Sequence, residues 1–508
     1  MSPMAKPDNG MPHLLCHNQF VLGPEPLTRY GGWQHVPVTS TCHLSAHPNL
    51  HVTQIEAGGI ALTAVGYMID PLNPQASDEA VLQRVHERMA AGQGYVDATG
   101  DLGGRWVLIA RTASTMELIT DAVGHRQVFY TAVTEGLPLW CASQPRILAE
   151  LTDQQMDADA ASFIDSYEFR KNLEYRWPGA GSPYKGVFHL LPNHRLDLNS
   201  GKCQRYWPDR PLPQVSVEAA VPKVAAYLKG GVEAVARRFD LAVSLTAGLD
   251  SRTVLAAARN VVGKNPVMTV RQIDKPDDHP DVQVASQLAS LLGLGHDIIK
   301  SSLIIDDAFL QSFKQHTALP HYIYVPDAQA IYNRYQRKRV AVTGSISEIG
   351  RLSFRMLLRK PETEPIDAYD LARLQKMGRQ AYAVKAFGEW QSGLGNIHNV
   401  PLLDMFEWEQ GHGNWLAMCH TEFDMAWKDL YSPFNCRNLL TLLLSVDSRH
   451  RQGTDCRLYN ELINTLWPDV LQVPINPQYR SKPRLTAVVI SKIPYPIKKS
   501  IKQLLRRR

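Results

Sequence analysis

The segment from Asp240 to Arg252, DLAVSLTAGLDSR, constrains the fold more than any other part of the chain. An apolar run of strand length leads into small residues and then into a helical pattern that begins TVLAAA. Small side chains at Thr246, Ala247 and Gly248 let backbone N–H groups approach an anion closely, and the start of the helix adds a partial positive charge. We therefore expect a phosphate-binding loop between a strand and a helix.

Hydroxyl and carboxyl groups flank this loop. Ser244 and Ser251 can donate hydrogen bonds to phosphate oxygens, whereas Asp250 is unhelpful to a bare phosphate unless a divalent cation lies between them. Asp250 therefore indicates Mg²⁺. The composition alone does not distinguish a phosphate-binding loop from a tight turn at Gly248 in which Asp250 and Ser251 cap the helix.

Strand-length and helix-length patterns alternate after this loop. Strands are expected at Val267–Val270, Asp297–Ile299 and Arg339–Thr343, and a helix is expected from Asp281 to Leu292. This alternation predicts a parallel sheet with crossover helices. Beyond about residue 365 the pattern is mainly helical.

The first 150 residues have a different pattern. Apolar runs of strand length, such as Gly59–Met68, Trp106–Ala110 and Met116–Thr120, are separated by Gly, Asp and Pro turns. Such spacing predicts a half that is rich in antiparallel sheet.

The length of the chain predicts two domains. At 508 residues it exceeds the roughly 250–300 residues at which a single hydrophobic core stops growing. A proline-rich stretch from Tyr206 to Pro213 marks a boundary, so we expect domains at 18–210 and 214–490 and a basic tail at 491–508. For this tail a solvated terminus is favoured over a contact with a membrane or with nucleic acid.

The composition narrows the class of protein. Apolar residues make up 44% and charged residues 20%, which is typical of a soluble globular protein. There is no run of about 20 apolar residues, and the start of the chain lacks the order of a signal peptide, so a cytoplasmic protein is expected. The seven cysteines form no CxxC pair, which favours free buried thiols over a zinc site or a disulfide framework.

The order of residues in the loop adds a family resemblance. SLTAGLDSR resembles the SGGxDS pyrophosphate loop of the ATP pyrophosphatase families, with Thr246 and Ala247 in place of the usual small pair. Asp278-His-Pro-Asp281 and the helix after it resemble the segment that follows the second strand in asparagine synthetases.

A second turn, from Val340 to Gly350, resembles the GEGxDE turn of asparagine synthetases, with Glu348 at the position of the family's second metal-binding acid. The resemblance implies ATP and Mg²⁺ as cofactors, with the metal shared by Asp250 and Glu348. It also implies a set of nucleotide-binding residues: Ser244, Thr246, Ala247, Gly248, Leu249, Asp250, Ser251, Gly344 and Ser345.

Two residues of this turn depart from the family pattern. Ser345 stands where asparagine synthetases carry the Glu that handles ammonia and where beta-lactam synthetases carry Tyr. This departure puts ammonia in doubt as the substrate. Ile346 replaces the second glycine of the turn, so we expect a changed local geometry.

Two catalytic candidates follow from resemblances near the end of the chain. Trp467 to Lys482 resembles the family's "LP…RxK" segment, which implies that Lys482 neutralises charge growing on pyrophosphate and on the tetrahedral intermediate. An exposed surface lysine is the alternative. Glu422 lies ahead of Ser432–Arg437, which resembles the region of the family's "E.R.PF.D" stretch, and is the second candidate.

Three blocks of the first half resemble class II glutaminase domains. Thr99–Leu108, Ile119–Tyr130 and Trp140–Ser143 resemble, in order, the GDFAF, RDxxGxxPLYY and FASE blocks of that family. The alternative is an unrelated sandwich in which the Gly-Asp pairs only make turns.

The glutaminase nucleophile is absent from its expected place. In the family it is a Cys whose free N-terminal amine serves as the base. Here Ser2 would be exposed only after removal of the first Met, and Cys16, upstream of the first strand at Phe20, would need a cut before it. The family's glutamine-holding NGE turn is also absent around Gly66. We therefore expect no glutamine hydrolysis.

The resemblances imply a two-domain protein of mixed α/β and α+β class. An Ntn-hydrolase-like αββα sandwich would precede a parallel-sheet ATP pyrophosphatase domain of the adenine nucleotide alpha hydrolase type. The implied activity is that of an asparagine synthetase-like carbon–nitrogen ligase, which activates a carboxylate as an acyl-adenylate and transfers it to an amine.

The implied partners are small-molecule or peptide carboxylate and amine substrates, and a homodimer or a biosynthetic partner protein is compatible with them. One alternative is intramolecular amide formation, as in beta-lactam synthetases and lasso-peptide cyclases. Another is a non-catalytic relative that binds a nucleotide or a partner.

Overall fold

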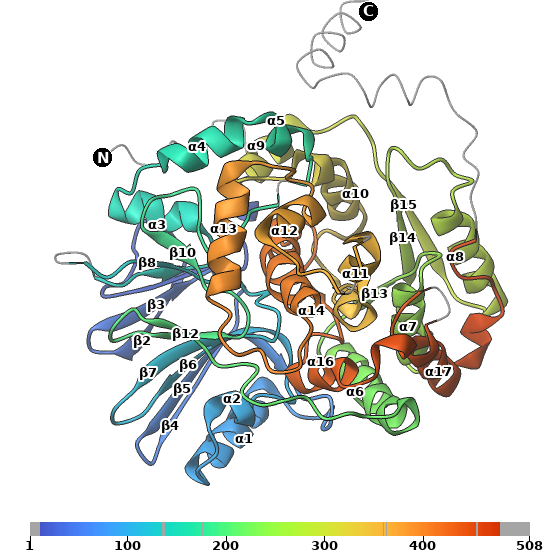
Figure 1. The fold of residues 1–508 in the computed structure, drawn as a ribbon, viewed down its shortest axis with the longest axis horizontal. Helices are drawn as coiled ribbons and strands as arrows, with labels where there is room; N and C mark the ends of the chain where they lie inside the picture. Colours follow the sequence, from blue (N-terminus) through green and yellow to red (C-terminus); the bar gives the residue numbers. More distant parts are fainter. Residues whose placement is uncertain are drawn as a thin grey trace, which may run out of the picture.

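The computed structural model describes residues 11–134, 138–174, 176–358, 360–361, 363–453 and 456–477 (Figure 1). Two six-stranded sheets lie on one side of the molecule and a five-stranded sheet lies on the other. None of the helices in these ranges is both long and apolar enough to cross a membrane.

The first two sheets are antiparallel. One has the strand order β10 (Val187–His189), β8 (Phe129–Thr131), β9 (Cys141–Ala142), β1 (Phe20–Gly23), β3 (Cys42–Ala46) and β2 (Gln34–Thr39). The other has the order β12 (Cys203–Arg205), β11 (His194–Asp197), β7 (Met116–Thr120), β6 (Gly103–Arg111), β5 (Ile60–Ile69) and β4 (Val52–Ala57). The predicted antiparallel first half is confirmed.

These sheets face each other across an apolar core. Leu22 and Leu44 of the first sheet share this core with Val107 and Ile109 of the second. On the outer faces, α3 (Pro145–Thr152) covers the first sheet and α1 (Asp78–Ala90) covers the second. The layers therefore run helix, sheet, sheet, helix, because each strand buries one face on its partner sheet and the other on a helix.

The third sheet is parallel throughout. Its order is β15 (His296–Lys300), β14 (Val267–Arg271), β13 (Leu241–Ser244), β16 (Val340–Val342) and β17 (Asp429–Tyr431). The predicted alternation is confirmed for the first four strands in the chain. The fifth, β17, was not predicted, because its three residues lie inside a region whose pattern is mainly helical.

Helices surround the parallel sheet and fill the space between the two halves. The remaining helices are α2 (Tyr95–Ala98), α4 (Ala158–Asp165), α5 (Tyr167–Lys171), α6 (Val217–Arg238), α7 (Leu249–Ala257), α8 (Pro280–Leu291), α9 (Asp307–His316), α10 (Val325–Tyr335), α11 (Ser353–Leu358), α12 (Ala368–Leu374), α13 (Ala381–Ser392), α14 (Leu402–Phe406), α15 (Ala417–Phe423), α16 (Arg437–Leu444) and α17 (Arg457–Leu466).

Short 3₁₀ turns and one π-helix complete the described chain. The 3₁₀ turns are η1 (Pro12–Leu14), η2 (Tyr322–Tyr324), η3 (Ser347–Arg351), η5 (Ser448–His450) and η6 (Pro468–Leu471). The π-helix, η4, spans Glu407–Leu416 and runs directly from α14 into α15.

Buried ion pairs join the two halves. Arg105 on β6 contacts Asp424 at 2.6 Å and Asp429 at 2.8 Å, and Arg126 contacts Asp429 at 2.8 Å. Both arginine side chains are 2% exposed. Since a buried charge without a partner is costly, these contacts fix the first half against the segment that enters β17.

Candidate functional site at the edge of the parallel sheet

The strand order places two loops side by side at one edge of the parallel sheet. The chain leaves β13 toward β14 on one side, whereas β16 lies on the other side of β13. In open parallel sheets, ligands bind outside the carboxyl ends of the strands at such a reversal. The loop after β13 begins at Leu245 and the loop after β16 begins at Thr343, so both predicted phosphate-site segments meet there.

The first loop is ordered by its own hydroxyl groups. The Ser251 hydroxyl accepts a hydrogen bond from the Thr246 N–H at 3.1 Å, and the Thr246 hydroxyl accepts one from the Gly248 N–H at 3.2 Å. Gly248 is the N-cap of α7, so Leu249, Asp250 and Ser251 form its first turn. Leu249 is 1% exposed, which leaves only its backbone for a ligand.

An acid from the next crossover also reaches this loop. The Ala247 N–H donates to the Asp281 carboxylate at 3.2 Å, and Lys275 contacts the same carboxylate at 2.8 Å. The positive charge of Lys275 and these hydrogen bonds outweigh burial and lower the pKa of Asp281. The segment from Asp278 to Asp281 therefore contacts the loop that follows β13.

Gly344 brings the second loop against the first. A Cβ atom at this position would lie 2.6 Å from the carbonyl carbon of Asp250 and 2.8 Å from the nitrogen of Ser251. Only a residue without a side chain allows this approach. Gly344, Asp250 and Ser251, three of the predicted nucleotide-site residues, are therefore in contact.

Asp250 is held by residues of η3. Its Oδ1 atom accepts hydrogen bonds from the Ser347 hydroxyl and from the Arg351 guanidinium. Arg351 in turn lies over the ring of Tyr459, 5.9 Å from its centroid. The Asp250 carboxylate is thus oriented by the turn that carries Glu348.

Glu348 provides the second acid of the predicted metal pair. Burial and the negative charge of Asp250 raise the pKa of Glu348 to about 8. Its Oε2 atom is buried and has no hydrogen-bond partner among the described residues, and His412 Nε2 lies 3.8 Å from it. Two carboxylates that repel each other, one with an unsatisfied oxygen, fit a divalent cation that prefers oxygen ligands.

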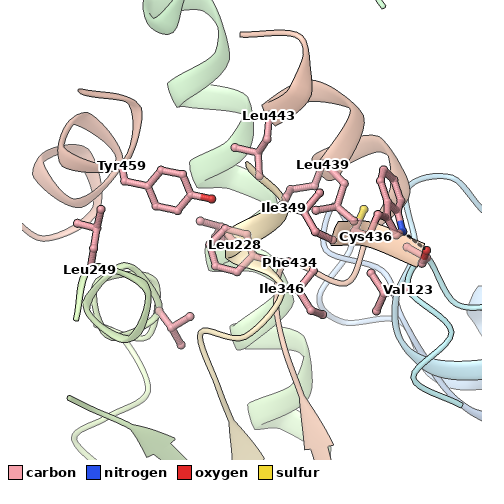
Figure 2. Packing of buried hydrophobic residues seen from close by; sticks show 14 of the residues in the cluster. Val123, Leu228, Leu249, Ile346, Ile349, Phe434, Cys436, Leu439, Leu443 and Tyr459 are labelled. Carbon is pink, nitrogen blue, oxygen red and sulfur yellow. Dashed lines mark hydrogen bonds between the residues drawn. The ribbon is translucent and has the colours of Figure 1, made fainter. Parts of the chain in front are cut away.

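Ile346 has an unusual backbone conformation. Its φ is +81° and its ψ is −27°, a region that glycine favours and a β-branched residue rarely adopts. The backbone of Ile346 therefore has a conformation that its side chain disfavours. Figure 2 shows Ile346 and Ile349 among the buried side chains of Phe434 and Leu439, whose packing holds the turn in place.

Ser345 lies in a group of hydroxyls. Its hydroxyl is 2.7 Å from that of Thr343, and its carbonyl oxygen accepts a hydrogen bond from the Ser432 hydroxyl at 2.5 Å. None of these three side chains carries a charge. Ser345 therefore contacts only uncharged hydroxyl groups in this part of the site.

The π-helix η4 is the part of the site that the sequence analysis missed. It brings Glu407 and His412, both 5% exposed, toward η3. Burial and the negative charges of Glu348 and Asp404 raise the pKa of Glu407 well above its usual range, and burial lowers the pKa of His412 to about 3. Two glycines among polar residues, in EWEQGHGNW, were the only available signal. π-helices occur often at functional sites.

The same helix reaches the first half of the chain on its other side. Glu409 pairs with Arg205, and the Trp408 indole donates to the Ala122 carbonyl oxygen at 2.8 Å. The Asn414 amide donates to the Trp177 carbonyl oxygen at 2.9 Å. η4 therefore connects the antiparallel half to the turn that carries Glu348.

Glu422 lies in a different cluster from the one expected. Its Oε1 atom accepts a hydrogen bond from the His321 N–H at 2.9 Å and lies 2.8 Å from His321 Nδ1. Cys419, one turn earlier on α15, belongs to the same cluster. The structure thus groups Glu422 with His321 and Cys419, whereas Asp250 and Glu348 are grouped by the η3 turn.

Lys482 and Ser2 lie outside the described residues. The chain before Lys482 nevertheless reaches the site, because the Asn476 N–H donates to the Ala247 carbonyl oxygen at 3.0 Å. The Arg252 guanidinium also donates to the Pro474 carbonyl oxygen at 2.6 Å. The segment that leads to Lys482 is therefore anchored on the phosphate-type loop.

Cys16, the thiol considered in place of the missing nucleophile, is buried. Cys16 is 4% exposed in an apolar cluster, and burial raises its pKa to about 11. The residues before β1 are occupied elsewhere, since the Met11 N–H donates to the Ser312 hydroxyl at 2.7 Å. None of the seven cysteines forms a disulfide; Cys203 is half-buried and the others are buried.

A cavity of about 430 Å³ lies between the two halves, away from the Asp250 site. Its lining includes Gly66 and Tyr67 of β5, Arg126, and Lys428 just before β17.

No protein-family model matches the sequence, and no curated protein matches it. Among solved structures, the chain is similar to glutamine phosphoribosylpyrophosphate amidotransferase from B. subtilis complexed with ADP and GMP, with 12% identity, 69% of this chain and 75% of that chain covered, and a TM-score of 0.23. It is also similar to the structure of the allosteric regulatory enzyme of purine biosynthesis, with 10% identity, 73% and 74% covered, and a TM-score of 0.23. Likenesses at this TM-score define neither the fold nor the function of the chain.

Proposed function

We propose that the chain is an ATP-dependent, AMP-forming ligase that joins a carboxylate to an amine. The observation that carries this proposal is the contact of Gly344 with Asp250, which sets two acids beside a loop of small residues at a helix N-terminus. Such a loop favours phosphate, and the acids favour a cation that bridges the phosphate to the protein.

The reaction would proceed in two steps that share one site. A substrate carboxylate oxygen attacks the α-phosphorus of ATP, and pyrophosphate leaves, which gives an acyl-adenylate. The amine nitrogen then attacks the acyl carbon, AMP leaves with the bonding electrons, and the amine loses a proton. Adenylation is chemically useful because a free carboxylate is a poor acyl donor at neutral pH.

The chain's own residues have separable roles in this scheme. The first turn of α7 would bind the pyrophosphate portion. The N–H groups of Thr246, Ala247 and Gly248 donate to acceptors within the protein, so they would bind phosphate only by exchanging these acceptors. Mg²⁺, when bound, neutralises phosphate charge, and Asp250 and Glu348 would hold it. Lys482 would add positive charge opposite the leaving pyrophosphate.

The amine is best sought on a larger substrate. Cys16 is buried and protonated at neutral pH, so ammonia from glutamine has no source in the described part of the chain. Ser345 and Thr343 offer neutral hydroxyls rather than a carboxylate at the position associated with ammonia. Both features favour an amine on a second substrate or within the same molecule as the carboxylate.

Pyrophosphate exchange tests the proposal without knowledge of the amine. The purified chain is incubated with ATP, Mg²⁺, radiolabelled pyrophosphate and pools of candidate carboxylates, and label entering ATP is counted. We expect exchange that depends on one pool and is lost in Asp250→Ala and Glu348→Ala. Glu461→Gln, an exposed acid on α17, is the matched control and should retain exchange.

A non-catalytic nucleotide-binding protein is the second candidate. The ion pair between Arg351 and Asp250 favours it, because a guanidinium occupies one oxygen of the expected metal ligand. Binding of ATP without exchange for any carboxylate, unaffected by Asp250→Ala, would support this second candidate and contradict the ligase. Binding that is lost in Asp250→Ala would keep the ligase and call for further carboxylates.

A further inference from the structure

Three side chains with metal-ligand chemistry form a buried cluster apart from the Asp250 site. His321 precedes η2, and Cys419 and Glu422 lie one turn apart on α15. One ligand atom of each residue lies within 4.8 Å of those of the other two. The three residues are 0%, 5% and 1% exposed, respectively.

The Glu422 carboxylate is only half satisfied within this cluster. Its Oε1 atom accepts the His321 backbone N–H at 2.9 Å and lies 2.8 Å from His321 Nδ1. Its Oε2 atom is buried and has no hydrogen-bond partner among the described residues. Leaving a buried carboxylate oxygen without a partner costs free energy, so a further ligand for Oε2 would stabilise the fold.

We propose that His321, Cys419 and Glu422 bind a zinc ion. Imidazole nitrogen, thiolate sulfur and carboxylate oxygen are the ligand types that zinc takes in proteins. Bonds of about 2.0–2.3 Å place the ligand atoms of a tetrahedral site about 3.3–3.8 Å apart, so the three ligand atoms, which lie within 4.8 Å of one another, would move closer together on binding.

Charge balance also favours a divalent ion over an empty cluster. One thiolate and one carboxylate neutralise the two positive charges of zinc, so the bound site has no net charge in a fully buried place. His321 Nδ1 would bind the zinc in place of its present contact with Glu422 Oε1. Oε2 then binds the metal while Oε1 keeps the His321 N–H, which orients the ligand from outside the coordination shell.

A structural zinc site is four-coordinate, so one ligand beyond these three residues is required. The Tyr324 ring lies beside the cluster, with its centroid 5.6 Å from that of His321. The zinc would fasten the segment around η2 to α15, which leads through Asp424 into β17.

The metal content of the purified chain tests this proposal. Because the cluster is buried, the ion must enter during folding, so the protein is produced with added zinc and purified without chelators. We expect one zinc ion per chain by mass spectrometry of the elements, and a loss of roughly ten-fold or more in Cys419→Ser and in Glu422→Gln. Cys436→Ser, another buried thiol, is the matched control and should keep the metal.

A cobalt-loaded sample keeps the test independent of variant folding. Wild-type protein refolded with Co²⁺ should show the near-ultraviolet charge-transfer absorption of a cobalt–thiolate bond. The proposal is overturned if the wild-type protein contains no zinc both as isolated and after refolding with zinc. It is also overturned if the cobalt-loaded protein lacks the thiolate band. Neither measurement uses substrate, so the outcome is separate from that of the ligase proposal.

Discussion

Gly344 and Asp250 touch through their backbones, with no room for a methyl group between them. A Cβ atom at residue 344 would lie 2.7 Å from the Asp250 carbonyl oxygen, which is backbone and cannot rotate away. The distance between the two loops, and so between the two acids they carry, therefore depends on this glycine.

Gly344→Ala should separate the two loops. We expect a loss of roughly 1–3 kcal/mol in the free energy of unfolding from overpacking, and a fall of roughly 100-fold in pyrophosphate exchange from misplacement of the acids. Urea unfolding and the exchange assay measure the two effects. Gly263→Ala is the matched control, because a Cβ there meets no atom within 4 Å. Unchanged exchange in Gly344→Ala would contradict the role given to this contact.

The thiol groups should be inert in the folded protein. Burial raises the pKa of Cys16, Cys42 and Cys203 to about 11, so roughly one thiol in a thousand is ionised at pH 8. Since the thiolate is the reactive form, an alkylating reagent should modify less than one equivalent at pH 8 and all seven cysteines after denaturation. Rapid labelling of Cys16 in the native chain, located by peptide mass spectrometry, would reopen the question of a thiol nucleophile.

At Ile346 glycine should destabilise the protein less than alanine does, which is the reverse of the usual order. Alanine and glycine both remove a side chain that is 0% exposed, but only glycine adopts φ +81° without strain. Ile346→Gly should therefore be about 1 kcal/mol less destabilising than Ile346→Ala in urea unfolding, although glycine is the smaller residue. At Ile349, which has no positive φ, the usual order with glycine as the more destabilising residue serves as the control.

The parallel sheet was predictable because its signals are local. An apolar run, a small-residue turn and a helix start follow one another from Asp240 to Arg252, and further strand-length apolar runs followed by turns occur near Val267 and Arg339. β17 was missed because three residues carry no period of their own. The π-helix was missed because its i to i+5 hydrogen bonding has no distinct apolar pattern in a segment that is mostly buried.

The candidate site was predictable only in part, for a related reason. The contact of Gly344 with Asp250 could be expected, because both follow strands whose carboxyl ends meet at one edge. Glu422 was assigned from flanking letters, which do not reveal side-chain direction; its helix turns it toward His321. The ion pairs of Arg105 and Arg126 depend on how two distant segments dock, which no local pattern records.

Those ion pairs carry the last prediction. Asp424→Ala removes a carboxylate that both buried arginines approach, Arg105 at 2.6 Å and Arg126 at 3.9 Å. The remaining Asp429 cannot neutralise two guanidinium groups, so one positive charge stays buried without a partner. We expect a loss of roughly 3–5 kcal/mol in the free energy of unfolding, measured by urea denaturation.

Asp165→Ala is the control for this prediction, since Asp165 and its partner Arg170 are 71% and 64% exposed and water replaces the lost contact. That variant should lose less than about 1 kcal/mol. Equal effects of the two substitutions would mean that water reaches Arg105 and Arg126 in solution. The two halves would then be held together mainly by the apolar core that they share around Trp408 and Trp207, whose rings lie 4.7 Å apart.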